Sequence, residues 1–118
     1  MALDFMTDDP AGLLDLFNER IEQKEEKGKI KTWVRSADKE YYTHKSDEWG
    51  KAAWFKPIIK DDRLTFNIIK PKNKNVSTVA YGYYHGHLTE TFLNHFDTEF
   101  TAATSTAFPT SKDMVRKK

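Results

Sequence analysis

The sequence predicts an α+β fold in a single domain: a curved antiparallel sheet of about five strands, with an N-terminal helix and a second helix near residues 87–97 packed on one face. Its 118 residues suffice for one hydrophobic core but not for two. Helically spaced apolar residues on either side flank a middle region of β-rich runs separated by turn residues. The domain is expected to cover residues 1–110, and the polar residues 111–118 to form a disordered C-terminal tail.

The first predicted helix covers residues 10–27. Asp8 or Asp9 supplies a side-chain cap for its N-terminus, and Pro10 stands in the first turn, where a missing N–H costs nothing. Gly28 provides a left-handed stop at the C-terminal end. One apolar stripe runs along the helix and is made of Leu13, Leu14, Phe17 and Ile21.

The middle of the chain is predicted to form consecutive antiparallel strands. Residues 60–62 separate two β-rich runs, which is a hairpin signal. Pro57 lacks an N–H and favours an edge strand or a bulge. The expected strands are 29–35, 40–44, 51–59, 63–69 and 76–84. Residues 98–107 are rich in threonine and alanine, so we leave open whether they add a further strand.

Between the last of these strands and the second helix lies the segment YGYYHGHLTE, residues 81–90. In a strand, Tyr81, Tyr83 and His85 share one face. Gly86 then permits the bend into the helix. The apolar stripe of that helix consists of Leu88, Phe92 and Phe96. The two histidines of the segment are therefore interpreted as marking a corner of the backbone.

Composition excludes several classes of site. The chain has no cysteine, which removes disulfides, thiolate metal ligands and cysteine nucleophiles. It has neither a glycine-rich phosphate loop nor a Gly-x-Ser-x-Gly nucleophile motif. The acidic N-terminus lacks the pattern of a secretory signal, and no apolar run approaches the roughly 20 residues of a membrane span. A cytoplasmic protein is therefore predicted.

His85 and His87 have the spacing of a strand-borne pair of metal ligands. Two ligands fall short of the three or four protein groups that zinc sites use, and His95 lies about 12 Å farther along a helix. No metal site and no cofactor are predicted. Acid–base chemistry is the alternative: a small enzyme or ligand-pocket protein that uses His85 and His87, with Glu90 as a neighbouring carboxylate.

Charge is distributed unevenly along the chain, although the net charge is +1. Residues 51–75 hold seven Lys or Arg against two Asp, interleaved with Trp54, Phe55 and Phe66. Such a pattern is typical of single-stranded nucleic-acid binding, which is the second alternative. Residues 1–28 hold eight Asp or Glu against three Lys or Arg. Because nucleic-acid-binding domains usually have a clearly basic balance, this alternative is disfavoured.

The leading interpretation is a non-catalytic intracellular binding or interaction protein. Helices on one side of a curved sheet leave the other side free for contact, and the predicted strands place amphipathic aromatic side chains there. A protein partner or a small ligand is expected, and the same surface suits a homodimer interface. The predicted contact residues are Trp33, Trp54, Tyr83, His85 and His87.

Overall fold

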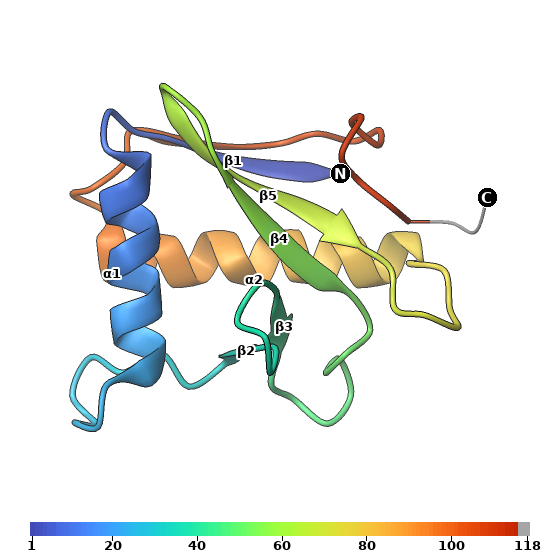
Figure 1. The fold of residues 1–118 in the computed structure, drawn as a ribbon, viewed down its shortest axis with the longest axis horizontal. Helices are drawn as coiled ribbons and strands as arrows, with labels where there is room; N and C mark the ends of the chain where they lie inside the picture. The colour runs from blue at the N-terminus through green and yellow to red at the C-terminus, as the bar shows by residue number, and fades with distance from the viewer. Residues whose placement is uncertain (116–118) are drawn as a thin grey trace.

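Six strands pair in one antiparallel sheet, in the order β2–β3–β4–β5–β1–β6, and two helices pack against it (Figure 1). The structure is a computed structural model in which residues 1–115 are described. The strands are β1 (Ala2–Met6), β2 (Trp33–Arg35), β3 (Tyr42–His44), β4 (Trp54–Ile59), β5 (Arg63–Ile69) and β6 (Ala102–Ser105). The helices are α1 (Pro10–Glu22) and α2 (Thr78–Phe96). The predicted α+β fold around one antiparallel sheet is confirmed.

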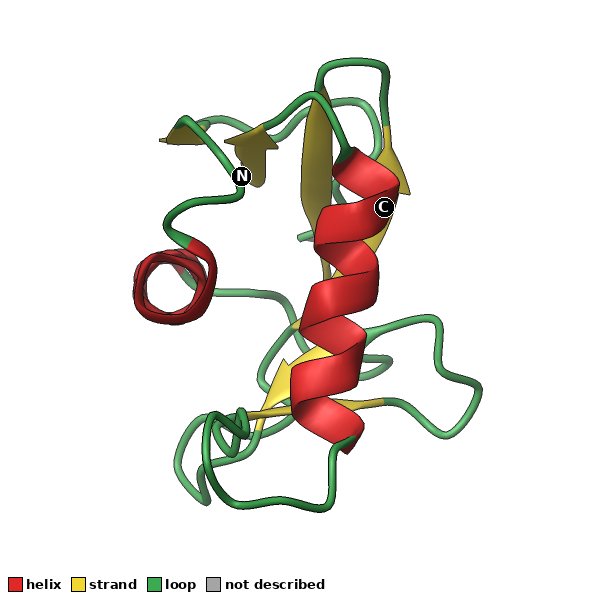
Figure 2. Cartoon of the chain, turned by 90° about the vertical axis from the view of Figure 1, so that its left-hand side faces the viewer, coloured by secondary structure: helices red, strands yellow, loops and turns green. Residues whose placement is uncertain are grey.

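Both helices pack on the same face of the sheet and share one core. The ring of Phe66 in β5 is 5.9 Å from that of Phe17 in α1 and 5.7 Å from that of Phe92 in α2. Phe17 and Phe92 also meet, with their ring centroids 5.0 Å apart. Figure 2 shows α2 end-on and α1 from its side, so the two helices run in different directions over the sheet. Burial of these large rings supplies much of the hydrophobic stabilisation.

The strand β1 lies inside the sheet, between β5 and β6, and is absent from the strands that the sequence predicted. Leu3 and Phe5 are fully buried on the core face. Asp4 lies on the opposite face, where it accepts a hydrogen bond of 2.6 Å from the hydroxyl of Thr65. The alternation of Leu3, Asp4 and Phe5 is a strand signal, but it covers too few residues to stand out before a helix cap.

The helix α1 begins as predicted and ends five residues earlier than predicted, at Glu22. A carboxylate oxygen of Asp9 caps it by accepting a hydrogen bond of 3.0 Å from the N–H of Gly12. After the helix, the side-chain amide of Gln23 donates to two backbone carbonyls of the following residues, at 2.9 and 2.8 Å. Gly28 completes this turn with a φ of 77°. The side-chain hydrogen bonds of Gln23 therefore replace the last turn of the predicted helix.

The prediction of a strand over residues 76–84 and of a helix near residues 87–97 is wrong in its boundaries. The helix α2 begins at Thr78 and includes the whole YGYYHGHLTE segment. Ser77 caps it: its hydroxyl oxygen accepts a hydrogen bond of 3.1 Å from the N–H of Ala80. Core-facing residues recur at every fourth position of α2, which is a helical spacing. They are Ala80, Tyr84, Leu88, Phe92 and Phe96. His85 and His87 thus lie within a helix, not at a corner of the backbone.

The hairpin predicted around residues 60–62 is confirmed and joins β4 to β5. The other predicted strands of the middle region are present in shorter form, as β2, β3 and β4. Among the described residues, β3 pairs with β4 only at Tyr42 and Phe55, so Pro57 lies on a free edge of β4, as its missing N–H suggests. β6 adds the strand left open in the sequence, and all four of its residues are exposed.

Residues 113–115 pack against the sheet, although their polar surroundings in the sequence predict a disordered tail. Met114 forms a bridge with Ile69 at the end of β5, where β1 no longer pairs with that strand. Val115 is buried in the core cluster. The free backbone groups at the end of β5 give this segment its hydrogen-bond partners. Residues 116–118 of the predicted tail lie outside the described residues.

Candidate functional site

The five side chains predicted to share a contact surface lie in three different environments. Trp33 and His85 are buried, with exposures of 1% and 6%. Tyr83 and His87 are half-buried on the side of α2 that contacts His44 of β3, and Trp54 is half-buried on the sheet face that neither helix covers. The structure therefore does not bring them together as one patch, because the helical conformation of α2 removes residues 83–87 from the sheet.

Trp33 is part of the hydrophobic core. Its indole N–H donates a hydrogen bond of 3.1 Å to the hydroxyl of Thr91 in α2. Its ring lies 5.6 Å from that of Tyr84 and 5.9 Å from that of Phe55. A buried tryptophan with a satisfied N–H stabilises the fold and is not accessible to a partner.

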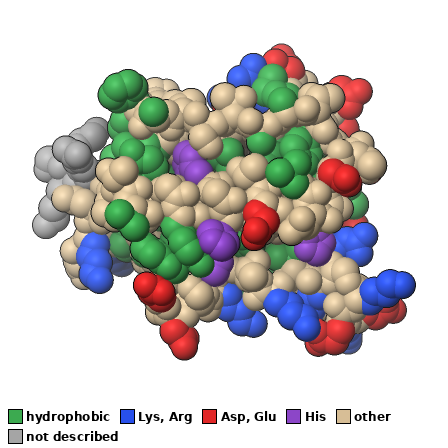
Figure 3. Space-filling view, turned by 180° about the vertical axis from the view of Figure 1, so that it is seen from behind, with side chains coloured by type: hydrophobic (Ala, Val, Ile, Leu, Met, Phe, Trp, Pro, Cys, Tyr) green, Lys and Arg blue, Asp and Glu red, His purple; other side chains and the backbone are tan. Residues whose placement is uncertain are grey.

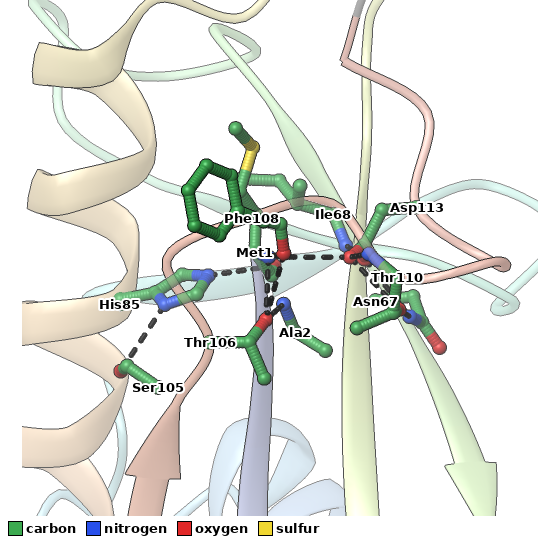
Figure 4. Close-up of polar contacts among 10 residues, drawn as sticks. All are labelled: Met1, Ala2, Asn67, Ile68, His85, Ser105, Thr106, Phe108, Thr110 and Asp113. Carbon is green, nitrogen blue, oxygen red and sulfur yellow. Dashed lines mark hydrogen bonds and ion pairs between the residues drawn. The ribbon is translucent and has the colours of Figure 1, made fainter.

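Both ring nitrogens of His85 have partners (Figure 4). Nε2 lies 2.8 Å from the carbonyl oxygen of Met1, and Nδ1 lies 3.2 Å from the hydroxyl of Ser105. Because a carbonyl oxygen can only accept, Nε2 carries the proton and Nδ1 accepts from the hydroxyl. Burial lowers the pKa of His85, which favours this neutral form. His85 therefore joins α2 to the chain beside β1 and β6 and has no nitrogen free for acid–base chemistry.

The carboxylate of Asp113 forms the second part of the same network (Figure 4). It accepts hydrogen bonds from the backbone N–H of Ile68 at 3.0 Å, the side-chain amide of Asn67 at 2.8 Å and the N–H of Thr110 at 2.7 Å. The amino group of Met1 lies 3.3 Å away. Burial raises the pKa of Asp113, but the hydrogen bonds outweigh it, and the resulting pKa lies below the ordinary value. The ionised carboxylate fixes this segment to β5.

A second set of rings lies where α2 meets β3 and the loop that follows β3. Tyr83 is stacked between Trp49 and His87, with centroid distances of 4.5 and 4.0 Å. His44 meets this stack edge-on, 5.4 Å from His87. The N–H of Ser46 donates to Nδ1 of His44, so Nε2 carries the proton of the neutral ring; it is buried and has no hydrogen-bond partner among the described residues. Burial, and then the charge of His87, lowers the pKa of His44.

Within residues 1–115, these histidines do not belong to a group of metal-ligating side chains. No group of three or more His, Asp or Glu side chains there is placed to hold a metal ion. His85 and His87 are two residues apart on a helix, so their side chains point in nearly opposite directions. Glu90 lies 3.8 Å from Nδ1 of His87 in an exposed contact. The predicted combination of His85, His87 and Glu90 is therefore divided between the core and the surface.

The open face of the sheet carries an apolar hollow at Trp54. Its volume is about 280 Å³. Its lining residues are Tyr41, Trp54, Ile69, Lys70, Pro71 and Lys72. Lys56 lies beside it, with Nζ 5.8 Å from the centre of the Tyr41 ring. Trp54 pairs with Ile69 across the β4–β5 ladder, which places both side chains on this face. The hollow is therefore built from two aromatic rings and surrounded by lysines.

The sequence identified Trp54 as a contact residue but not Tyr41 or the lysines after β5. A signal for Tyr41 was present in the predicted strand 40–44. Neighbouring residues of a strand face opposite sides, so only one of Tyr41 and Tyr42 can enter the core. Tyr42 is the buried one, and its ring contacts Phe17 of α1.

Two larger clefts lie near the β4–β5 turn and the start of α1. They measure about 500 and 370 Å³ and share Thr7, Asp8, Thr98 and Glu99. Their carboxylates are all exposed and belong to Asp8, Asp9, Asp15, Glu19, Asp61, Asp62 and Glu99. A hydrogen bond from Arg63 lowers the pKa of Asp62. These solvated acids give this end of the molecule a negative potential, whereas the surroundings of Trp54 are positive.

Neither of the two helices is long and apolar enough to span a membrane, within the part of the chain that the structure describes. No protein-family model matches the chain, and comparisons with curated proteins and with solved structures gave no match. Its function is therefore inferred from the geometry of its side chains.

Proposed function

We propose that this protein is a non-catalytic binding protein whose open sheet face accepts an acidic segment of a partner protein. The supporting observation is the hollow at Trp54, where two aromatic rings provide an apolar site and Lys56, Lys70 and Lys72 provide positive charge around it. Apolar pockets that receive one anchoring side chain often dominate the energy of a protein interface. Charges at the rim attract and orient the partner.

The size of the hollow favours a protein partner over a small-molecule ligand. Pockets for drug-sized molecules measure about 300–1,000 Å³ and bury most of the ligand. At about 280 Å³ the hollow at Trp54 falls just below this range. It suits one large apolar side chain, while acidic residues on either side of that anchor lie over the lysines.

The distribution of charge favours an acidic protein segment over single-stranded nucleic acid. A nucleic-acid strand binds along a continuous track of cations that neutralises its phosphates. The β4–β5 hairpin instead ends in Asp61 and Asp62, beside the exposed carboxylates of Asp8 and Glu99. The positive charge near Trp54 thus forms a patch and not a track.

A catalytic role for His85, His87 and Glu90 has less support. Both nitrogens of His85 are engaged in structural hydrogen bonds, and His87 is stacked on Tyr83. General acid–base catalysis needs a group whose proton can reach a substrate. We propose the cytoplasm as the compartment, as the sequence predicts.

The test uses a fluorescent peptide in which glutamates flank one phenylalanine. We expect it to bind the wild-type chain and to bind Trp54→Thr, or the double variant Lys70→Gln/Lys72→Gln, at least about tenfold more weakly, equivalent to about 1.4 kcal/mol. Lys60→Gln removes an exposed lysine from the hairpin turn and serves as the matched control, with unchanged affinity. Fluorescence anisotropy measures all four proteins.

Two further probes define what would overturn the proposal. One is a peptide of the same length with lysines in place of the glutamates, and the other is a single-stranded DNA oligonucleotide. The proposal fails if the acidic peptide does not bind, if both peptides bind equally, or if the oligonucleotide binds more tightly than the acidic peptide. It also fails if Lys60→Gln weakens binding as much as Trp54→Thr does.

A further inference from the structure

The helix α2 is exposed on one side yet carries almost no charge. Its 19 residues contain one carboxylate, Glu90, and no lysine or arginine. Over the longer stretch 76–110 the only charged side chains are Glu90, Asp97 and Glu99, in a chain of which 31% is charged. Figure 3 views this side of the molecule: hydrophobic, histidine and other uncharged atoms cover most of its middle, with acidic atoms among them, and lysine and arginine gather mainly along its lower edge. Depletion of charge is typical of the centre of a protein interface.

The exposed side of α2 carries apolar residues and glycines at helical spacing. Val79 and Leu93 are large apolar side chains that are 67% and 52% exposed. Gly82 and Gly86 lie between them, and a Cβ atom added at either would meet nothing within 4 Å. Steps of three, four and seven residues put all four on one face of the helix. This face offers two apolar contacts with a shallow depression between them.

We propose that the outer face of α2 packs against the same face of a second copy of this chain, with the two helices antiparallel and crossing at Gly86. Val79 and Leu93 are each seven residues from Gly86, about 10.5 Å along the helix axis. A two-fold axis at Gly86 therefore places Val79 of one copy on Leu93 of the other, and the reverse. Such self-complementarity is the property that a symmetric dimer interface requires.

The same two-fold axis leaves the carboxylates of the interface well separated. Glu90 lies four residues after Gly86, and Gly82 lies four residues before it. Each Glu90 is therefore opposite a glycine of the second copy, and the two Glu90 positions are about 12 Å apart along the helices. No like charges come face to face, so the arrangement has no repulsion to overcome.

The strand β6 extends this face, which carries few charges, beyond α2. A stable interface buries about 800 Å² on each partner, and a strip along a helix of about 28 Å does not provide that alone. β6 is joined to α2 by the contact of His85 with Ser105, and the nearby Phe108 is 84% exposed. The edge strand β6 consists of alanine, threonine and serine, without the lysine and proline that protect the edge of β4 at Lys56 and Pro57.

The absence of basic residues from α2 distinguishes a second copy from a lipid surface. Helices that lie on membranes combine an apolar face with lysine and arginine beside it. The sequence of α2 has neither of these residues, and its apolar pattern is symmetric about Gly86. A second copy of the chain matches both features.

Sedimentation analysis over a wide range of concentration tests the proposal. We expect the wild-type chain to have twice the mass of the 13.8 kDa monomer at high concentration, and Gly86→Glu to shift to the monomer mass under the same conditions. Ala11→Glu, which adds the same charge at an exposed small residue of α1, is the matched control and stays dimeric. A wild-type chain that is monomeric at all concentrations, or a Gly86→Glu variant that stays dimeric, overturns the proposal.

A second variant covers the case in which Gly86→Glu does not fold. The chain has no cysteine, so a single Gly86→Cys substitution introduces the only thiol. Because position 86 lies on the proposed two-fold axis, mild oxidation should link two chains through a disulfide within the dimer. Ala11→Cys should stay unlinked under the same oxidation. Equal linking of the two variants, or no linking of Gly86→Cys, contradicts the proposed geometry.

Discussion

The open sheet face at Trp54 and the outer face of α2 are both exposed and partly apolar, yet their surroundings differ. Lysines surround the hollow at Trp54, whereas no lysine or arginine occurs in α2. A charged rim keeps an apolar site soluble while it is empty and attracts a partner of opposite charge. An exposed apolar face with few charges is stabilised when a partner covers it. The surface at Trp54 therefore suits transient binding of a partner, and the outer face of α2 suits a stable association.

The largest expected effect is the difference in stability lost when Trp33 or Trp54 is replaced by alanine. Trp33→Ala removes a fully buried ring and its hydrogen bond to Thr91, so the free energy of unfolding should fall by about 3–5 kcal/mol. Trp54→Ala changes the open face and should cost about 1 kcal/mol or less. Urea denaturation of both variants measures the difference. Equal losses would show that Trp54 serves the core and not a contact surface.

The hydrogen-bond network of His85 and Asp113 should make the stability of the fold depend on pH. The pKa of His85 is lowered in the folded chain. As the pH falls, the imidazole of His85 is therefore protonated in the unfolded chain before it is protonated in the folded chain. The free energy of unfolding should therefore fall as the pH drops below about 6.5, the ordinary pKa of histidine. Lowered pKa values of His44 and His95 add to the same trend.

The variant His85→Gln isolates the contribution of this ring. It should reduce the slope of the free energy of unfolding against pH, by up to about 1.4 kcal/mol per pH unit, in the range below 6.5. Denaturation curves at several pH values for the variant and the wild type supply the slopes. Parallel pH profiles would mean that His85 is not held neutral by its buried position.

A smaller difference between the two surfaces should appear in their response to salt. Binding of the acidic peptide at Trp54 depends on exposed lysines, so its affinity should fall by about tenfold between low and high salt. Association through α2 involves apolar contacts and should be unchanged or slightly stronger in high salt. Anisotropy and sedimentation measured in the same buffers give both values. Dimers that dissociate in high salt would indicate that charges, and not the apolar face, hold them together.

The sequence was informative where the local signals are strong. Strand 63–69 was predicted with the bounds that the structure has, because turn residues and alternating apolar residues define it. The start of α1 was predicted from Asp9 and Pro10, which act within one turn of the helix. Such signals need no knowledge of distant contacts.

The first part of α2 was mispredicted because two patterns overlap there. Tyr81 and Tyr83 alternate with smaller residues, as in a strand, while Ala80 and Tyr84 have helical spacing. Gly82 weakens the helical signal further, since glycine costs about 1 kcal/mol in a helix relative to alanine. Packing of Tyr84 and of the residues that follow it at every fourth position decides in favour of the helix. This packing involves strands far away in the sequence, which a local pattern does not contain.

The structure separates the five predicted contact residues for the same reason. Trp33 and Trp54 are alike in sequence, since each is followed by one apolar residue and then by a basic one. Trp33 is covered because α2 crosses its side of the sheet and offers Thr91 as a partner. Trp54 lies on the opposite side, beside Tyr41. Only the position of α2 distinguishes the two tryptophans.

Isotope-labelled protein observed by nuclear magnetic resonance tests most directly whether the two surfaces act independently. Addition of the acidic peptide should shift the indole N–H signal of Trp54 and leave the amide signals of Gly82 and Gly86 in place. Dilution of the protein alone should shift the signals of Gly82 and Gly86 and leave that of Trp54 in place. The division of this protein into two binding surfaces is contradicted if the peptide shifts the signals of Gly82 and Gly86. It is also contradicted if the peptide does not shift the signal of Trp54 and dilution does not shift those of the two glycines.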